Sequence, residues 1–234
     1  VSGDVDPQEV LRLAQETYGK ISARSLPPRI RPVEPPHVAP REVVLRDARV
    51  DQPFWSRRYL APSYVSGETQ HAYALELLAE IFGGTTTSRL YRSVVVDGAL
   101  AASAGAWYTP GDLDLTEFGL WFSPRPGVAV DDVRAAIDAQ IAILLEKGIT
   151  EDELARSKQR LIDSAVFARD SVGGPAHIFG AALTQGRTAA DVEAWPDRIR
   201  AVTLEQVNAA ARAVFDINQS TTGVLLPADG DSRT

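Results

Sequence analysis

The chain contains no cysteine and no methionine among its 234 residues. Without cysteine there can be no disulfide, no thiolate metal site and no thiol nucleophile. Apolar runs stay well short of the roughly 18 residues that a membrane-spanning helix needs, so we expect no membrane segment. Because methionine is absent, we also expect further sequence before Val1, where any signal peptide would lie.

Basic residues are in the minority, with 24 Lys and Arg against 31 Asp and Glu, and the formal net charge is −7. A nucleic-acid or anionic-membrane surface needs clustered Lys and Arg, so we expect no nucleic-acid partner. Hydrophobic residues make up 44% of the chain and charged residues 24%, as in ordinary globular proteins. The acidity is interpreted as a contribution to solubility.

Proline is concentrated in residues 26–40, which predicts an extended linker because proline removes backbone donors. Residues 1–25 before the linker read as a strand end followed by a helix. That helix has Asp6 as its N-cap, Pro7 in its first turn and Glu9 three residues after the cap. Residues 41–228 form the main domain in this interpretation, and residues 229–234 form a polar tail.

The main domain alternates between strand and helix patterns. Strands are predicted at 41–50, 53–61, 99–108, 115–122 and 220–226, and helices at 67–82, 88–96, 130–147, 150–169, 176–184, 189–200 and 204–215. Thr150 with Glu153, and Thr203 with Gln206, have the spacing of capping boxes. Strands joined by short turns should pair antiparallel, and helices must cover one face. The sequence therefore predicts an α+β fold: an antiparallel sheet with helices packed mainly on one face.

The histidines do not form a metal motif. His37, His71 and His177 are far apart, and neither H-E-x-x-H nor H-x-x-E-H occurs. Glu76 and Glu80 follow His71, but their spacing does not match a compact zinc triad. We therefore predict no metal ligands in this chain and interpret each histidine as a surface or core residue.

Other catalytic patterns are also missing. The acidic groups Asp131-Asp132 and Glu151-Asp152-Glu153 fall at predicted helix starts, where negative charge favours the helix dipole. Ser103 lacks the first glycine of a nucleophile elbow, and the glycine pairs at 83–84 and 173–174 lack the lysine of a phosphate loop. We therefore predict no catalytic residue in this chain.

Several motifs nevertheless resemble one enzyme family. The first motif is Ser88-Arg89-Leu90-Tyr91-Arg92, followed by Leu100-Ala101-Ala102-Ser103. It resembles the stretch S-R-L-[FY]-x-x-[IV]-R-E-K-x-G-L-A-Y-S of the insulinase family of zinc metallopeptidases. This family includes pitrilysin and the mitochondrial processing peptidase. Two further stretches resemble the family: Ile81-Phe82-Gly83-Gly84, and the opening Gly3-Asp4-Val5-Asp6-Pro7 with Glu9-Val10. Residues 180–187, ahead of Trp195-Pro196, resemble the bacterial members of the family. Their order and spacing cover nearly the whole chain.

The resemblance implies a role for each segment. Members of the family bind zinc through H-x-x-E-H and a downstream glutamate, and the motif glutamate activates a zinc-bound water. Those residues would precede Gly3, so zinc would be bound upstream of Val1 in the full-length parent, a zinc endopeptidase. Residues 1–25 would end the zinc-binding domain, and 41–228 would be the second, non-metal domain. This domain would form chamber wall and subunit contacts around a peptide substrate, in the bacterial periplasm.

Two positions depart from the family pattern. The family's arginine and tyrosine, which contact the peptide and the transition state, align with Val95 and Ala102. Neither side chain can donate a hydrogen bond, so the resemblance implies a homologous partner chain that supplies the pair. A homodimer is the other assembly that the resemblance allows. Two alternatives remain at this point. One is a non-catalytic structural subunit of such an assembly, and the other is a stand-alone binding module that shares only the fold.

Overall fold

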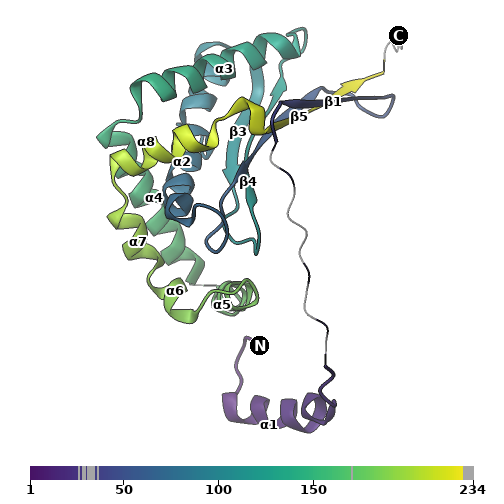
Figure 1. Ribbon diagram of the computed structural model, residues 1–234, viewed down its shortest axis with the longest axis vertical. Helices are drawn as coiled ribbons and strands as arrows, with labels where there is room; N and C mark the ends of the chain where they lie inside the picture. The colour runs from purple at the N-terminus through teal and green to yellow at the C-terminus, as the bar shows by residue number, and fades with distance from the viewer. Residues whose placement is uncertain (26, 28–29, 31–34, 36, 170, 229–234) are drawn as a thin grey trace.

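The computed structural model describes residues 1–25, 27, 30, 35, 37–169 and 171–228. Most of the predicted linker at 26–40 and all of the tail at 229–234 therefore lie outside the described residues. The first helix, α1 (Pro7–Thr17), begins as predicted, because the Asp6 carboxylate accepts a hydrogen bond of 2.8 Å from the Gln8 amide. Residues 1–5 do not form the expected strand, since a strand needs a hydrogen-bonded neighbour and no described strand pairs with them. A short 3₁₀ turn (Tyr18–Lys20) follows α1, which lies apart from the main domain (Figure 1).

Within the described residues, five strands form one mixed sheet. They are β1 (Arg41–Asp47), β2 (Phe54–Ala61), β3 (Ala101–Tyr108), β4 (Thr116–Pro124) and β5 (Ser220–Pro227), in the spatial order β1-β5-β2-β4-β3. All neighbours pair antiparallel except β1 and β5, which are parallel. The predicted α+β fold class is confirmed.

One pairing differs from expectation. The strands β1 and β2 follow one another in sequence, yet β5 lies between them and pairs with both. The six residues between β1 and β2 can span roughly 20 Å, which is enough to cross one intervening strand at a spacing of about 4.8 Å. The short connection between β1 and β2 therefore does not require these two strands to pair with each other.

Among the described residues, seven α-helices complete the domain: α2 (Ala72–Gly83), α3 (Val130–Lys147), α4 (Glu151–Arg169), α5 (Gly174–Thr184), α6 (Ala189–Glu193), α7 (Trp195–Ala201) and α8 (Leu204–Val214). The domain also has the short 3₁₀ segments Thr69–His71 and Ile217–Gln219 and a π-helix at Tyr91–Asp97. The predicted helix at 189–200 divides at Ala194, because Pro196 begins a new helix and cannot continue the old one. Both predicted capping boxes form.

The core lies between the sheet and the helices that cover it (Figure 1). Alternate residues of β2 and β4, including Tyr59 and Phe118, are buried, as the two-residue period of a strand requires. Phe215, just after α8, contacts both rings edge-on, with centroids 5.2 Å from Tyr59 and 5.3 Å from Phe118. The end of α2 docks directly on β3, since a Cβ on Gly83 would lie 2.1 Å from the Ala106 amide nitrogen.

Candidate functional site

One face of the sheet carries none of the described helices of the main domain. Figure 1 shows α2–α8 on the other side of the sheet, with α1 apart from both. On the face without these helices lie Phe54 and Arg58 of β2, Trp107 of β3, and Gly119 and Trp121 of β4, which we call the open face. Phe54 is 38% exposed and stacks on Trp121 with a centroid separation of 6.1 Å. The open face is therefore aromatic.

Two tryptophans lie over glycines on this face. Trp107 is paired with Gly119 across the strands, and a Cβ on Gly119 would lie 2.0 Å from the ring. Trp121 is paired with Gly105, where a Cβ would lie 2.7 Å from the indole nitrogen. Only glycine lets each ring lie this close to the neighbouring strand. The result is two large rings held near the level of the backbone.

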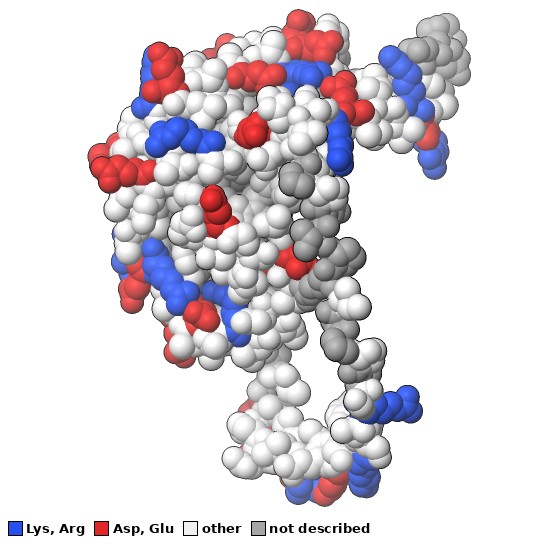
Figure 2. Space-filling model, in the orientation of Figure 1, with Lys and Arg blue, Asp and Glu red and all other residues white. Residues whose placement is uncertain are grey.

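A charged pair borders the same surface. The Arg58 guanidinium lies 5.8 Å from the centroid of the Trp107 ring and 3.2 Å from the Glu117 carboxylate. Both charged side chains are partly exposed, so the pair adds little stability by itself. On the helical side, visible in Figure 2, acidic and basic side chains are interspersed over the surface.

The structure places the two aligned positions near each other. Val95 lies in the π-helix, is 7% exposed and belongs to the core. Ala102 is exposed and lies at the register shift between Ala101 and Ser103 in the pairing of β3 with β4. Such bulges and π-helices are over-represented at functional sites. At both positions the side chain remains unable to donate a hydrogen bond.

Arg125 joins the backbone at these positions. Its Nη2 donates to the Val95 carbonyl at 3.1 Å, and its Nε donates to the Ala101 carbonyl at 3.2 Å. Its backbone amide also donates to the Leu100 carbonyl at 2.9 Å. Sequence reasoning missed Arg125, because nothing between its flanking prolines marks which carbonyls it will reach.

The Ser-Arg-Leu motif has a structural role in this chain. Arg89 donates from Nε to Glu153 at 2.6 Å and from Nη2 to the Gly148 carbonyl at 2.9 Å. Burial alone raises the pKa of Glu153, but the hydrogen bonds from Arg89 and Thr150 outweigh it and hold that pKa below its ordinary value. Arg89 therefore ties the segment after α2 to the start of α4. The predicted acidic helix starts are also found, in the first turns of α3 and α4.

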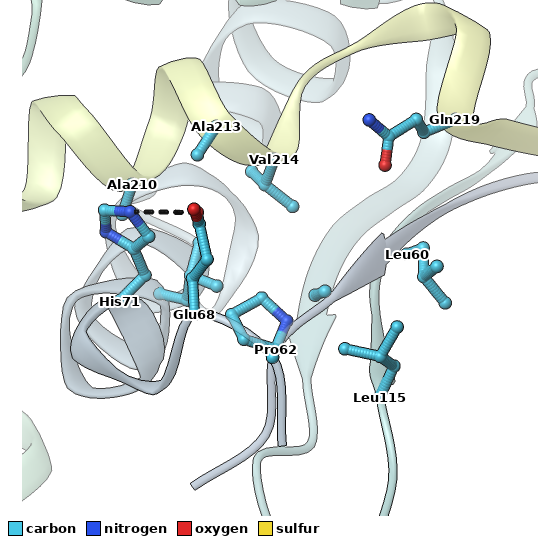
Figure 3. A pocket seen from close by; sticks show the side chains of 12 residues that line it. Leu60, Pro62, Glu68, His71, Leu115, Ala210, Ala213, Val214 and Gln219 are labelled. Atoms are coloured by element: carbon cyan, nitrogen blue, oxygen red, sulfur yellow. Dashed lines mark ion pairs between the residues drawn. The ribbon is translucent and has the colours of Figure 1, made fainter. Parts of the chain in front are cut away.

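The histidines lie on different elements. His71 ends a 3₁₀ turn, His177 lies in α5 and His37 lies in the segment before β1. Figure 3 shows His71 beside Glu68 at a pocket that Leu115 and Gln219 also line. The His71 Nε2 atom lies 3.5 Å from the Glu68 Oε2 atom, and the pocket has a volume of about 330 Å³. Within the described part of the chain, no three His, Asp or Glu side chains are grouped as metal ligands. The described residues therefore do not fit a zinc site.

A buried carboxyl group lies at one end of the helical layer. Glu76 of α2 accepts hydrogen bonds from the Tyr64 hydroxyl at 2.6 Å and from the Trp195 indole nitrogen at 3.1 Å. The same indole nitrogen lies 3.0 Å from the Tyr64 oxygen. Burial raises the pKa of Glu76 to about 7, despite the hydrogen bonds that oppose the shift. The only sequence signal was a glutamate between apolar residues on a predicted buried helix.

Comparison with known proteins identifies the family. Residues 1–161 match the family model described as the peptidase M16 inactive domain. This match covers more than half of the chain, so the chain belongs to that family. The predicted membership of a zinc peptidase family, as its inactive domain, is confirmed.

Three similar proteins come from bacteria. The chain is 27% identical over 218 residues to an uncharacterized zinc protease of Streptomyces coelicolor, covering 92% of this chain and 46% of that protein. It thus spans about half the length of this relative. A protease structure from Helicobacter pylori superposes with a TM-score of 0.85 at 21% identity, covering 97% of this chain and 54% of that one. The first half of the periplasmic protease PqqL from Escherichia coli gives 0.77 at 14% identity, covering 96% and 50%. These two likenesses show the fold.

Among the described helices, none combines the length and apolarity needed to cross a bilayer.

Proposed function

We propose that this chain is the non-catalytic second domain of a zinc-dependent endopeptidase and that its open face forms part of the wall of a peptide-holding chamber. The observation that carries the proposal is the aromatic sheet face opposite α2–α8, with Phe54 exposed and Trp107 and Trp121 partly exposed, in a member of the peptidase M16 inactive domain family. A monomeric domain rarely leaves such a surface exposed without a ligand or partner for it.

The chemistry of the open face suits an extended peptide. Trp107 and Trp121 present flat rings over glycines, so no side chain rises between them at those two positions. Aromatic side chains offer a large contact area at a small cost in conformational entropy. Arg58 can pair with a negatively charged group of a bound peptide, and Glu117 can pair with a positively charged group. In this proposal the domain binds substrate and performs no chemical step.

The remaining parts of the enzyme lie outside this domain in the proposal. Residues 1–25 end the zinc-binding domain, 26–40 link the two domains, and the metal is bound upstream of Val1 in the full-length parent. The arginine and tyrosine come from a homologous chain, because a second copy of this chain would also carry Val95 and Ala102. Two observations support this division: Val95 is in the core, and Ala102 lacks a donor.

The proposal is tested with the full-length parent. Its hydrolysis of a quenched fluorescent peptide is measured alone and after mixing with the homologous chain, with zinc measured by elemental analysis. We expect stoichiometric zinc and a rate at least about 10²-fold higher with the partner, since each missing oxyanion donor costs about 10²–10³ in rate. Full activity of a parent shown to be free of partner would contradict the division of roles.

A structural subunit is the second candidate, favoured by the loss of both donors at Val95 and Ala102. It differs in one observable, because a structural subunit would have no H-x-x-E-H upstream and would bind no zinc even at full length. Zinc in the purified full-length parent therefore decides between the two.

We also propose a bacterial periplasmic location for the parent. The support is its likeness in fold to PqqL, a protease described as periplasmic. Fractionation of cells that express an epitope-tagged full-length parent tests this location. Detection of the tagged protein only in the cytoplasmic fraction would contradict it.

A further inference from the structure

A second cavity lies in the helical layer, away from the open face. Its volume is about 650 Å³, within the usual range for small-molecule sites. Most of its lining is apolar, contributed by α4, α5, α6 and α7: Ala165, Pro175, Ile178, Phe179, Val192, Trp195 and Pro196. Tyr64, Arg187 and Glu193 add the polar groups. Arg187, which ends the stretch 180–187 that stood out in the sequence, and Trp195-Pro196 thus line one site.

One wall of this cavity is held rigidly. The Tyr64 hydroxyl and the Trp195 indole nitrogen both donate to the buried carboxyl group of Glu76. Tyr64 also packs against Tyr73, with ring centroids 5.0 Å apart. Two of the aromatic side chains that line the cavity are therefore fixed before any ligand arrives, which lowers the entropic cost of binding.

Arg187 is the cation of this cavity. Its guanidinium lies 4.0 Å from the centroid of the Tyr64 ring, and its Nη2 donates to the Asp191 carbonyl at 3.3 Å. The Asp191 carboxylate is occupied elsewhere, by the Thr188 amide at 2.9 Å and by Arg198 at 2.7 Å. Within the described part of the chain, no carboxylate forms an ion pair with Arg187. Ring stacking fixes the guanidinium while leaving donor hydrogens free.

From this arrangement we propose that the cavity binds a molecule with an apolar body and a terminal carboxylate, such as the C-terminal end of a peptide with large apolar side chains. The apolar walls take the body, and Arg187 takes the carboxylate through charge-assisted hydrogen bonds in the fork geometry of a guanidinium. The inference does not depend on the proposed function, because the cavity and the open face share no residue.

The test is calorimetric titration of the 234-residue chain with N-acetyl-leucyl-phenylalanine and with its C-terminal amide. The two probes have the same apolar body and differ only in the charged end. We expect the acid to bind about tenfold more tightly than the amide or better, because hydrogen bonds to a charged group contribute more than neutral ones. Decanoate, with an alkyl body, shows whether the site accepts fatty acids as well as peptide ends. Binding of decanoate, like exclusive binding of the peptide acid, supports an apolar carboxylate site.

Three variants separate charge from shape. Arg187→Gln should remove the preference for the acid, while Arg212→Gln, a matched change on α8 away from the cavity, should keep it. Phe179→Ala should weaken acid and amide alike, because it reduces the apolar wall that both probes contact. Circular dichroism confirms that each variant is folded. Equal affinity for acid and amide, absence of heat with every probe at millimolar concentration, or an unchanged acid preference in Arg187→Gln would overturn the proposal.

Discussion

Trp107 lies over Gly119 so closely that a Cβ at position 119 would sit 2.0 Å from the indole ring. The two residues are direct cross-strand partners on the open face. The glycine is thus the reason that the ring can lie flat, and the flat ring is what makes the open face smooth. This relationship leads to the first prediction.

Gly119→Ala should destabilise the domain by about 1–3 kcal/mol, because the new methyl group must displace a packed tryptophan ring. Urea unfolding followed by circular dichroism measures the change. Gly180→Ala is the matched control, since a Cβ there meets nothing within 4 Å and the residue lies in α5. The control should be neutral or slightly stabilising, as expected for alanine in a helix. Equal effects of the two substitutions would show that the Trp107 contact is unimportant.

Ala99→Gly should stabilise the domain. Ala99 is the described non-glycine residue with a positive φ, at 51°, and it aligns with a glycine in the insulinase pattern. The left-handed conformation costs an alanine about 1–2 kcal/mol, while the extra freedom of an unfolded glycine offsets part of that gain. We therefore expect a net gain of about 0.5–1 kcal/mol in the free energy of unfolding, and a loss would contradict the assigned backbone conformation.

Arg125→Gln should loosen the connection between the π-helix and β3. The substitution removes the guanidinium that bonds the carbonyls of Val95 and Ala101. Hydrogen–deuterium exchange should rise in residues 94–102, with a loss of about 1–2 kcal/mol in overall stability. Arg212→Gln serves as the control, and exchange that stays unchanged at 94–102 would argue against this role of Arg125.

Glu76 should make stability depend on pH. Its pKa is raised to about 7 from an ordinary value of 4.5, so the folded state keeps a proton that the unfolded state releases between these values. Its contribution is fully present below about pH 4.5 and is lost as pH rises through 7. Glu76→Gln can still accept the bonds from Tyr64 and Trp195 but cannot titrate.

Urea unfolding at pH 5 and pH 8 tests this expectation. The free energy of unfolding of the unaltered chain should fall more between the two pH values than that of Glu76→Gln, by up to about 3 kcal/mol. Parallel pH profiles of the two proteins would mean that Glu76 does not carry a raised pKa.

Local signals predicted most of the elements. The alternation of buried and exposed residues gave β2 and β4, and the pairs Thr150–Glu153 and Thr203–Gln206 marked two helix starts. These features depend on neighbours within a few residues, so a single sequence contains them. The α+β class followed from their order.

Long-range contacts could not be read in the same way. The position of β5 between β1 and β2 joins segments at opposite ends of the main domain. Trp195 meets Glu76 across 119 positions of sequence, and Arg125 reaches the Val95 carbonyl across 30. Hydrophobic periodicity does not predict such long-range contacts, because they depend on how the sheet and the helical layer pack together. The alignment of Val95 and Ala102 came from family resemblance, and their surroundings came only from the structure.

The open face as a peptide-binding wall is the central claim, and steady-state kinetics of the full-length parent with its partner test it most directly. Trp107→Ala and Trp121→Ala are compared with Phe167→Ala, an exposed aromatic residue of α4 on the helical side. We expect KM for a fluorescent peptide to rise about tenfold or more in the two tryptophan variants with kcat nearly unchanged, because the lost contact binds substrate and transition state equally. Phe167→Ala should leave both constants unchanged. An unchanged KM in folded Trp107→Ala and Trp121→Ala enzymes would contradict the account.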